Sequence, residues 1–140
     1  MDPLETGHVA TPLLQGLRVV DLAAEPAVMT GRILADLGAD VVRPEPLSGD
    51  PARDDPPRFA AWNTGKRSVT VLGADDPDLL RLVATADVVV DTPGFPGAVT
   101  LDPAVAPDAV WVRVTPFGLD GPRADWRASD LGVLLERATD

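Results

Sequence analysis

The chain of 140 residues contains no cysteine and a single histidine. The absence of cysteine excludes disulfides, thiol catalysis and cysteine-based metal sites. His8 falls in an N-terminal segment with Pro and Thr, which we interpret as a flexible leader over residues 1–12. A solvated side chain is the more economical interpretation there than a catalytic one. The sequence thus offers neither cysteine nor histidine chemistry in its predicted folded part.

Long apolar runs are also missing. Apolar residues make up 45% of the chain, but no run approaches the roughly 20 residues that a membrane span needs. The N-terminus lacks a basic start followed by an apolar block, so no signal peptide is expected. We therefore expect a cytoplasmic protein that does not associate with membranes.

Basic residues are few. Twelve Lys and Arg stand against 22 Asp and Glu, and the formal net charge is −10. This balance argues against nucleic-acid binding, which relies on basic surface to displace counterions. An anionic ligand is compatible only where local Arg, Lys or helix N-termini reverse the average field.

Several catalytic motifs are absent. The chain has no glycine-rich dinucleotide fingerprint, Walker loop, serine nucleophile elbow or zinc-ligand spacing. Asp120, Asp125 and Asp130 are candidates for paired carboxylates or a hard-cation site. Turn and N-cap roles are commoner for Asp in such a loop, so we expect no metal.

What the sequence does contain is a strand–helix–strand unit over residues 16–43. Leu17 to Leu22 is a short, mostly apolar run typical of a parallel strand, and apolar residues at helical spacing follow until Gly38. Further strands are predicted at 68–72, 86–91 and 109–115, with helices beginning near 75 and 130 and an exposed loop over 44–57. We predict one α/β domain over residues 13–140, Rossmann-like, with a mostly parallel sheet flanked by helices.

Two segments carry possible binding chemistry. Glu25 to Ala27 lies between the first strand and its helix, and is as compatible with a bare turn as with a ligand loop. Lys66 and Arg67 form the one compact basic cluster beside a strand. They are able to hold phosphate groups, although spacing alone favours two solvated cations.

Read in order, the segments resemble the N-terminal part of the class III (CaiB/BaiF-type) CoA-transferases. The resemblance covers nearly all of the chain from Pro12 and rests on weak motifs that are specific jointly. They are Pro12-Leu13, Gly16 to Leu22, Leu34 to Arg43, Glu45-Pro46, Gly49 to Pro51, Asn63, Lys66 to Ser68, Ala86 to Val90, Phe117-Gly118 and Gly121-Pro122.

The resemblance implies that CoA thioesters bind near the first strand–helix loop and the Asn-Lys-Arg segment, without a metal. The candidate cofactor-binding residues are Ala24, Glu25, Arg43, Asn63, Lys66 and Arg67. In the transferases an aspartate attacks the thioester, and the resemblance places that residue C-terminal to anything present here. We expect no catalytic residue in this chain, and a homodimer or a partner chain that supplies the rest of the fold.

The chain departs from the family at three places. Glu25 to Val28 replaces the usual Ala-Gly-Pro, and residues 97–101 lack a usual Arg. Losing one charge-assisted phosphate contact costs roughly 1.5–3 kcal/mol. Ser129 stands where the related racemases have their catalytic His, which opposes a racemase. Alternatives to a transferase portion are a non-catalytic partner or scaffold subunit of the same fold, and an α-methylacyl-CoA racemase-type member.

Overall fold

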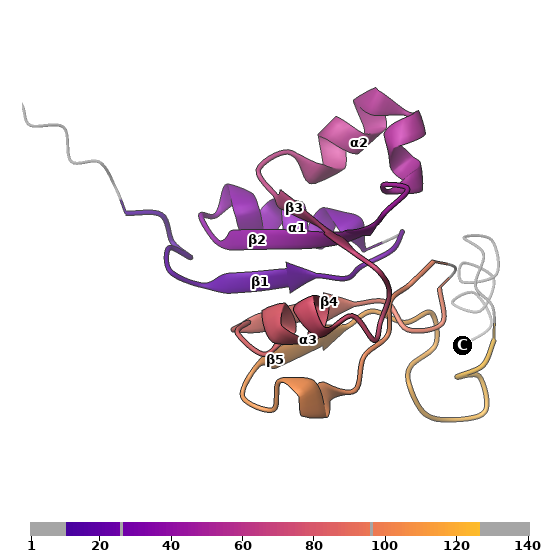
Figure 1. Cartoon of the computed structure of the whole chain (residues 1–140). Helices are drawn as coiled ribbons and strands as arrows, with labels where there is room; N and C mark the ends of the chain where they lie inside the picture. The colour runs from indigo at the N-terminus through magenta and orange to yellow at the C-terminus, as the bar shows by residue number, and fades with distance from the viewer. Residues whose placement is uncertain (1–10, 26, 96, 127–140) are drawn as a thin grey trace, which may run out of the picture.

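The fold is a five-stranded, wholly parallel sheet with helices on both faces (Figure 1). A computed structural model of the chain describes residues 11–25, 27–95 and 97–126. The strands, in the spatial order β3-β2-β1-β4-β5, are β1 (Arg18–Asp21), β2 (Asp40–Pro46), β3 (Arg67–Val71), β4 (Val88–Asp91) and β5 (Val110–Arg113). The α-helices are α1 (Val28–Asp36), α2 (Pro56–Asn63) and α3 (Pro77–Val83), with 3-10 turns η1 (Pro51–Asp54) and η2 (Pro103–Val105). The α/β prediction is confirmed.

The strand order places a topological switch between β1 and β4. The chain moves outward through β1, β2 and β3, and then returns to pair β4 with the other side of β1. In open α/β sheets, ligands bind beyond the carboxyl ends of the strands at such a point. Asp21 and Asp91 are the last residues of β1 and β4, and they mark that edge.

Two apolar cores cover the two faces of the sheet. Val20 and Val89 pack with Leu79 and Val83 of α3, while Val19, Val41 and Val90 pack on the α1 side. Helix α2 packs against α1 and extends that layer beyond β2 (Figure 1). The side chains of Val19, Val20, Val89 and Val90 are almost wholly buried, as expected for β-strands covered on both faces.

Helix α1 ends as the sequence predicts. Gly38 has φ +99°, a left-handed conformation that glycine adopts at little cost. The N–H groups of Gly38 and Ala39 donate back to the Ala35 and Leu34 carbonyls. A Cβ at Gly38 would lie 2.2 Å from Pro12 Cβ, so a larger residue is excluded by both torsion and space.

The prediction of one exposed loop over residues 44–57 is wrong. Strand β2 continues to Pro46, and the segment then forms η1 and the start of α2. β1 pairs with β2 only as far as Val42, so the two β2 prolines lie beyond that ladder, where a missing N–H is tolerated. The other prolines occupy first-turn positions behind Asp50 and Asp55, whose carboxylates cap the N–H groups of Ala52 and Arg58.

Several of the sequence predictions fall outside the residues that the structure describes. The leader falls almost wholly outside the described residues, and His8, Ser129, Asp130 and the helix expected over 130–137 lie entirely outside them. Within the described residues, none of the helices has the length and apolarity required to cross a bilayer.

Candidate functional site

A cavity of about 590 Å³ opens at the carboxyl edge of β1 and β2. Its floor is the end of β1, one wall is the β1–α1 loop, and the other comes from the end of β2, η1 and α2. Its charged and aromatic lining residues are Asp21, Glu25, Arg43, Asp50, Arg58 and Trp62, with Asn63 beside them. Gly97 and Val99, from the segment after β4, also line the cavity, so it lies at the topological switch.

Beneath this cavity lies a buried ion pair between Asp21 and Lys66. The Lys66 Nζ donates to Asp21 Oδ2 at 2.7 Å, to the Val28 carbonyl at 2.7 Å and to Asn63 Oδ1 at 3.0 Å. The Lys66 side chain is 1% exposed, and burial lowers the pKa of its ammonium even though Asp21 opposes the shift. All three ammonium protons are committed, so Lys66 ties β1, α1 and α2 together.

Gly31 makes this arrangement possible. It lies within α1, where a glycine costs about 1 kcal/mol relative to alanine. A Cβ at Gly31 would approach Asp21 Oδ2 to 2.3 Å and Lys66 Cε to 3.1 Å. The helix therefore lies directly on the ion pair, and only glycine permits that approach.

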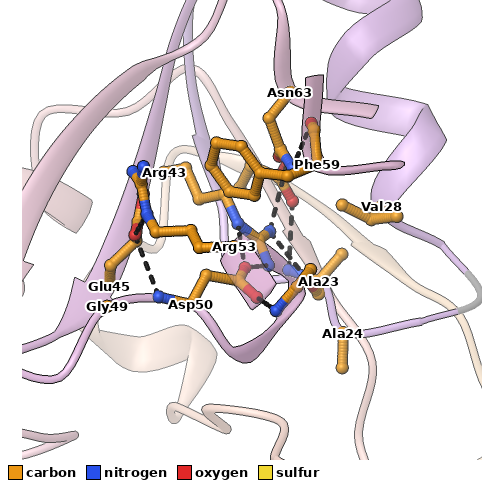
Figure 2. A network of polar contacts seen from close by, with 12 residues as sticks. Ala23, Ala24, Val28, Arg43, Glu45, Gly49, Asp50, Arg53, Phe59 and Asn63 are labelled. Carbon is orange, nitrogen blue, oxygen red and sulfur yellow. Dashed lines mark hydrogen bonds and ion pairs between the residues drawn. The ribbon is translucent and has the colours of Figure 1, made fainter. Parts of the chain in front are cut away.

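A second network, drawn in Figure 2, holds the β2–η1 wall. Arg43 binds Asp50 Oδ2 through Nε and Nη2 at 3.0 and 2.6 Å, and donates to the Ala23 carbonyl at 2.9 Å. Glu45 accepts both Nε and Nη2 of Arg53 at 2.7 Å, with the Ser68 hydroxyl at 2.7 Å. The Arg53 guanidinium, assisted by Ser68 and a backbone N–H, lowers the pKa of Glu45 to about 2.

The structure brings four of the six predicted cofactor-binding residues to the cavity. Ala24, Glu25, Arg43 and Asn63 line it. Lys66 lies behind it, fully engaged. Arg67 does not line it, because its guanidinium pairs with Asp40, the first residue of β2, at 2.7 Å.

Four charged or aromatic residues of the site were missed from the sequence: Asp21, Asp50, Arg58 and Trp62. An acidic residue ending an apolar strand was a usable signal for Asp21, because that position meets the ligand edge of the sheet. Arg58 and Trp62 belong to α2, and an eight-residue helix opened by two prolines gives little periodic signal.

A second buried carboxylate ends the neighbouring strand β4. Asp91 is fully buried, and Arg113 Nη2 of β5 lies 3.1 Å from its Oδ2 while donating to the Leu101 carbonyl at 2.7 Å. Among the described residues, neither Asp91 oxygen gains a well-aligned hydrogen bond, and Arg113 Nε also lacks a partner. Burial raises the pKa of Asp91, since the single cation opposes it incompletely.

Asp120 and Asp125 lie in the described part of the chain, where no group of three or more acidic or imidazole side chains is placed to hold a metal ion. Asp130 is outside that part.

Relatives in sequence have names that refer to CoA transfer. A probable fatty acyl-CoA transferase of Mycobacterium tuberculosis, Rv3272, is 35% identical over 95% of this chain and 39% of its own length. A succinate–glutarate CoA-transferase of Agrobacterium fabrum is 35% identical over 85% of this chain and 36% of its own length. The chain thus spans less than two-fifths of the length of these relatives.

Solved structures agree with this likeness. The crystal structure of Rv3272 superposes with a TM-score of 0.74 at 32% identity, over 92% of this chain and 39% of that one. A CaiB/BaiF family protein from Brucella suis gives 0.73 at 36% identity, over 86% of this chain and 38% of that one. The sequence model of CoA-transferase family III matches residues 14–136. The chain belongs to CoA-transferase family III.

Proposed function

We propose that this chain binds a CoA thioester in the cavity at the carboxyl edge of β1 and β2, as the CoA-binding portion of a protein that transfers CoA between carboxylic acids. The single observation that carries the proposal is the position of that cavity at the β1–β4 switch of a family III fold. Its volume of about 590 Å³ is within the range of small-molecule sites. Ala24, Glu25, Arg43 and Asn63 are the proposed contacts.

We assign the nucleophilic aspartate of a transferase to residues outside this chain. Both aspartates that line the cavity are held in buried or largely buried ion pairs, Asp21 with Lys66 and Asp50 with Arg43. A carboxylate attacks a thioester only if an oxygen is free to reach the carbonyl carbon. The same observation supports a second candidate, a non-catalytic partner subunit that binds CoA but transfers nothing.

Calorimetry with CoA tests the binding proposal directly. Ala24→Phe places a ring in the cavity and is expected to abolish CoA binding. Ala84→Phe adds the same ring to the exposed C-terminal end of α3 and should bind CoA as the parent chain does. Equal binding by both variants, or no binding by the parent chain, would overturn the proposal.

Mass spectrometry separates the two candidates. The chain is incubated with an acyl-CoA and a carboxylate acceptor, alone and with a family member that supplies the remaining length. Exchange above that of the longer protein alone supports a binding portion that works with a partner chain, and the absence of such an excess supports the non-catalytic candidate. Exchange by the chain alone would show that the nucleophile is present here after all.

We also propose a cytoplasmic location and an assembly with a second copy or a partner chain. The support for a partner is the greater length of the relatives, of which this chain spans 39% or less in the two cases given above. Native mass measurement tests this, because a monomeric mass at micromolar concentration would contradict it.

A further inference from the structure

Among the residues that the structure describes, every cation that lines the cavity already faces a carboxylate partner. Arg43 and Arg58 line it, and each of these cations already pairs with a carboxylate that lines it too. The three N–H donors of the Lys66 ammonium are all hydrogen-bonded to protein groups beneath the cavity floor. A phosphate group that binds one of these cations therefore competes with a protein carboxylate for it, and the free-energy cost of separating that ion pair decides which cation it meets.

Separating Arg43 or Lys66 from its carboxylate partner is strongly unfavourable. The Arg43 and Asp50 side chains are 12% and 11% exposed, and Asp21 lies 3.6 Å from Arg43 as well. Turning either cation toward a ligand would leave Asp50 or Asp21 buried without its partner. A buried charge stripped of its counterion is strongly disfavoured, so both cations stay with the protein.

Separating Arg58 from its carboxylate partner costs little free energy. Its ion pair with Glu25 spans the mouth of the cavity from α2 to the β1–α1 loop, and the two side chains are 45% and 53% exposed. Exposed pairs contribute little, and a released Glu25 would be solvated at once. The Arg58 guanidinium also lies 4.3 Å above the Trp62 ring, which keeps it oriented toward the cavity when Glu25 leaves.

We propose that Arg58 is the residue that binds the phosphate groups of the ligand at the cavity mouth, and that Glu25 competes with those phosphates for it. The proposal rests on the proposed CoA site and assigns its anion contact. Glu25 then lowers the affinity for an anionic ligand, because its carboxylate neutralises the Arg58 guanidinium that the phosphates bind. Arg43 supports the wall and does not leave Asp50.

The test is calorimetry of the full chain and two variants with three ligands: CoA, inorganic pyrophosphate and uncharged pantetheine. Glu25→Gln removes the competitor and is expected to tighten CoA and pyrophosphate binding about three- to tenfold. Arg58→Gln is expected to weaken both about tenfold, the lower end for one charge-assisted hydrogen bond. Pantetheine affinity should not change in either variant. Asp40→Asn and Arg67→Gln make the same kinds of change in an exposed pair outside the cavity and serve as matched controls.

The outcomes separate this inference from the CoA proposal. If CoA binds and neither variant alters its affinity, Arg58 is not the anion contact although the CoA site stands. If CoA does not bind but pyrophosphate binding responds to both variants as expected, the anion contact is supported and the CoA proposal fails. If neither ligand binds the parent chain or Glu25→Gln, both proposals are overturned.

Discussion

Asp21 and Asp91 end adjacent parallel strands, and both carboxylates are fully buried, yet their surroundings differ. Asp21 accepts hydrogen bonds from Lys66 and from the Ala23 N–H, and Arg43 lies nearby. Asp91 faces a single cation, Arg113, and neither of its oxygens gains a well-aligned hydrogen bond from the described residues. On the β1 side, the aspartate belongs to a fully hydrogen-bonded network beneath the cavity; on the β4 side, it belongs to an ion pair that lacks such hydrogen bonds and does not line the cavity.

This contrast separates two uses of the same residue type at the same edge. A fully partnered carboxylate organises the polypeptide around it: Asp21 fixes Lys66, and Lys66 in turn holds α1 and α2 in place as the walls of the cavity. A poorly partnered carboxylate in a buried site retains most of its desolvation penalty, which is why the pKa of Asp91 is raised. Because both aspartates are fully buried, the number of hydrogen-bond and ion-pair partners, and not burial, accounts for the difference between them.

The largest expected effect comes from making the same substitution at both positions. Asp21→Asn would leave the Lys66 ammonium buried without its counterion, and should lower the free energy of unfolding by about 3–5 kcal/mol. Asp91→Asn removes a carboxylate that is already poorly solvated, and should cost less than about 1.5 kcal/mol. Urea unfolding of the two variants measures the difference directly. Equal losses would show that the two sites are energetically alike and would break the comparison.

A smaller effect is expected at Gly31, which touches the Asp21 site alone. Gly31→Ala would normally favour a helix by about 1 kcal/mol. Here the new methyl group meets the buried Asp21 carboxylate, so we expect a net loss of about 1–3 kcal/mol in thermal or urea unfolding. Stabilisation by this substitution would mean that α1 can move off the ion pair. Met29→Ala, an exposed change in the same helix, provides the control for helix propensity.

The pH dependence of stability should show Glu45 of β2 and Asp91 of β4 acting in opposite directions. The folded-state pKa of Glu45 is lowered from 4.5 to about 2, so its contribution is present above pH 4.5 and is lost as the pH falls toward 2. Because half-exposed Arg53 is screened by water, we expect this contribution to be about 1–2 kcal/mol. Asp91 has a raised pKa, so its ionised form lowers the stability of the fold. This destabilisation is removed as the pH falls through the folded-state pKa toward 3.8.

Two variants separate these contributions in urea unfolding measured from pH 6 to pH 2.5. Glu45→Gln should be less stable than the parent at pH 6 and should approach it as the pH falls. For Asp91→Asn, the free energy of unfolding relative to the parent should instead be highest at pH 6 and should fall as the pH is lowered. If the difference in unfolding free energy between a variant and the parent stays constant across the pH range, the substituted residue does not make the pH-dependent contribution assigned to it.

The sequence was sufficient to predict the sheet, because β-branched runs and Gly38 mark β1, α1 and β2 locally. It was insufficient for Lys66, whose role depends on Asp21, 45 positions earlier in the chain. A lysine beside a glycine looks the same in sequence whether it faces phosphate or a buried carboxylate. Helix α2 was missed for a related reason: Pro56 and Pro57 are typical of loops, and only the Asp55 cap shows that they begin a helix.

The smallest effect is expected at Arg67, a predicted site residue whose guanidinium pairs with Asp40 and does not line the cavity. Its pair with Asp40 is exposed on both partners, so Arg67→Ala should change the free energy of unfolding by less than about 1 kcal/mol. CoA affinity should be unchanged, because the guanidinium does not line the cavity. Urea unfolding and calorimetry with CoA on the same preparation check both statements. A clear fall in CoA affinity with unchanged stability would restore Arg67 to the cofactor-binding role that the family resemblance implied, and would place the ligand across β3 as well as over β1 and β2.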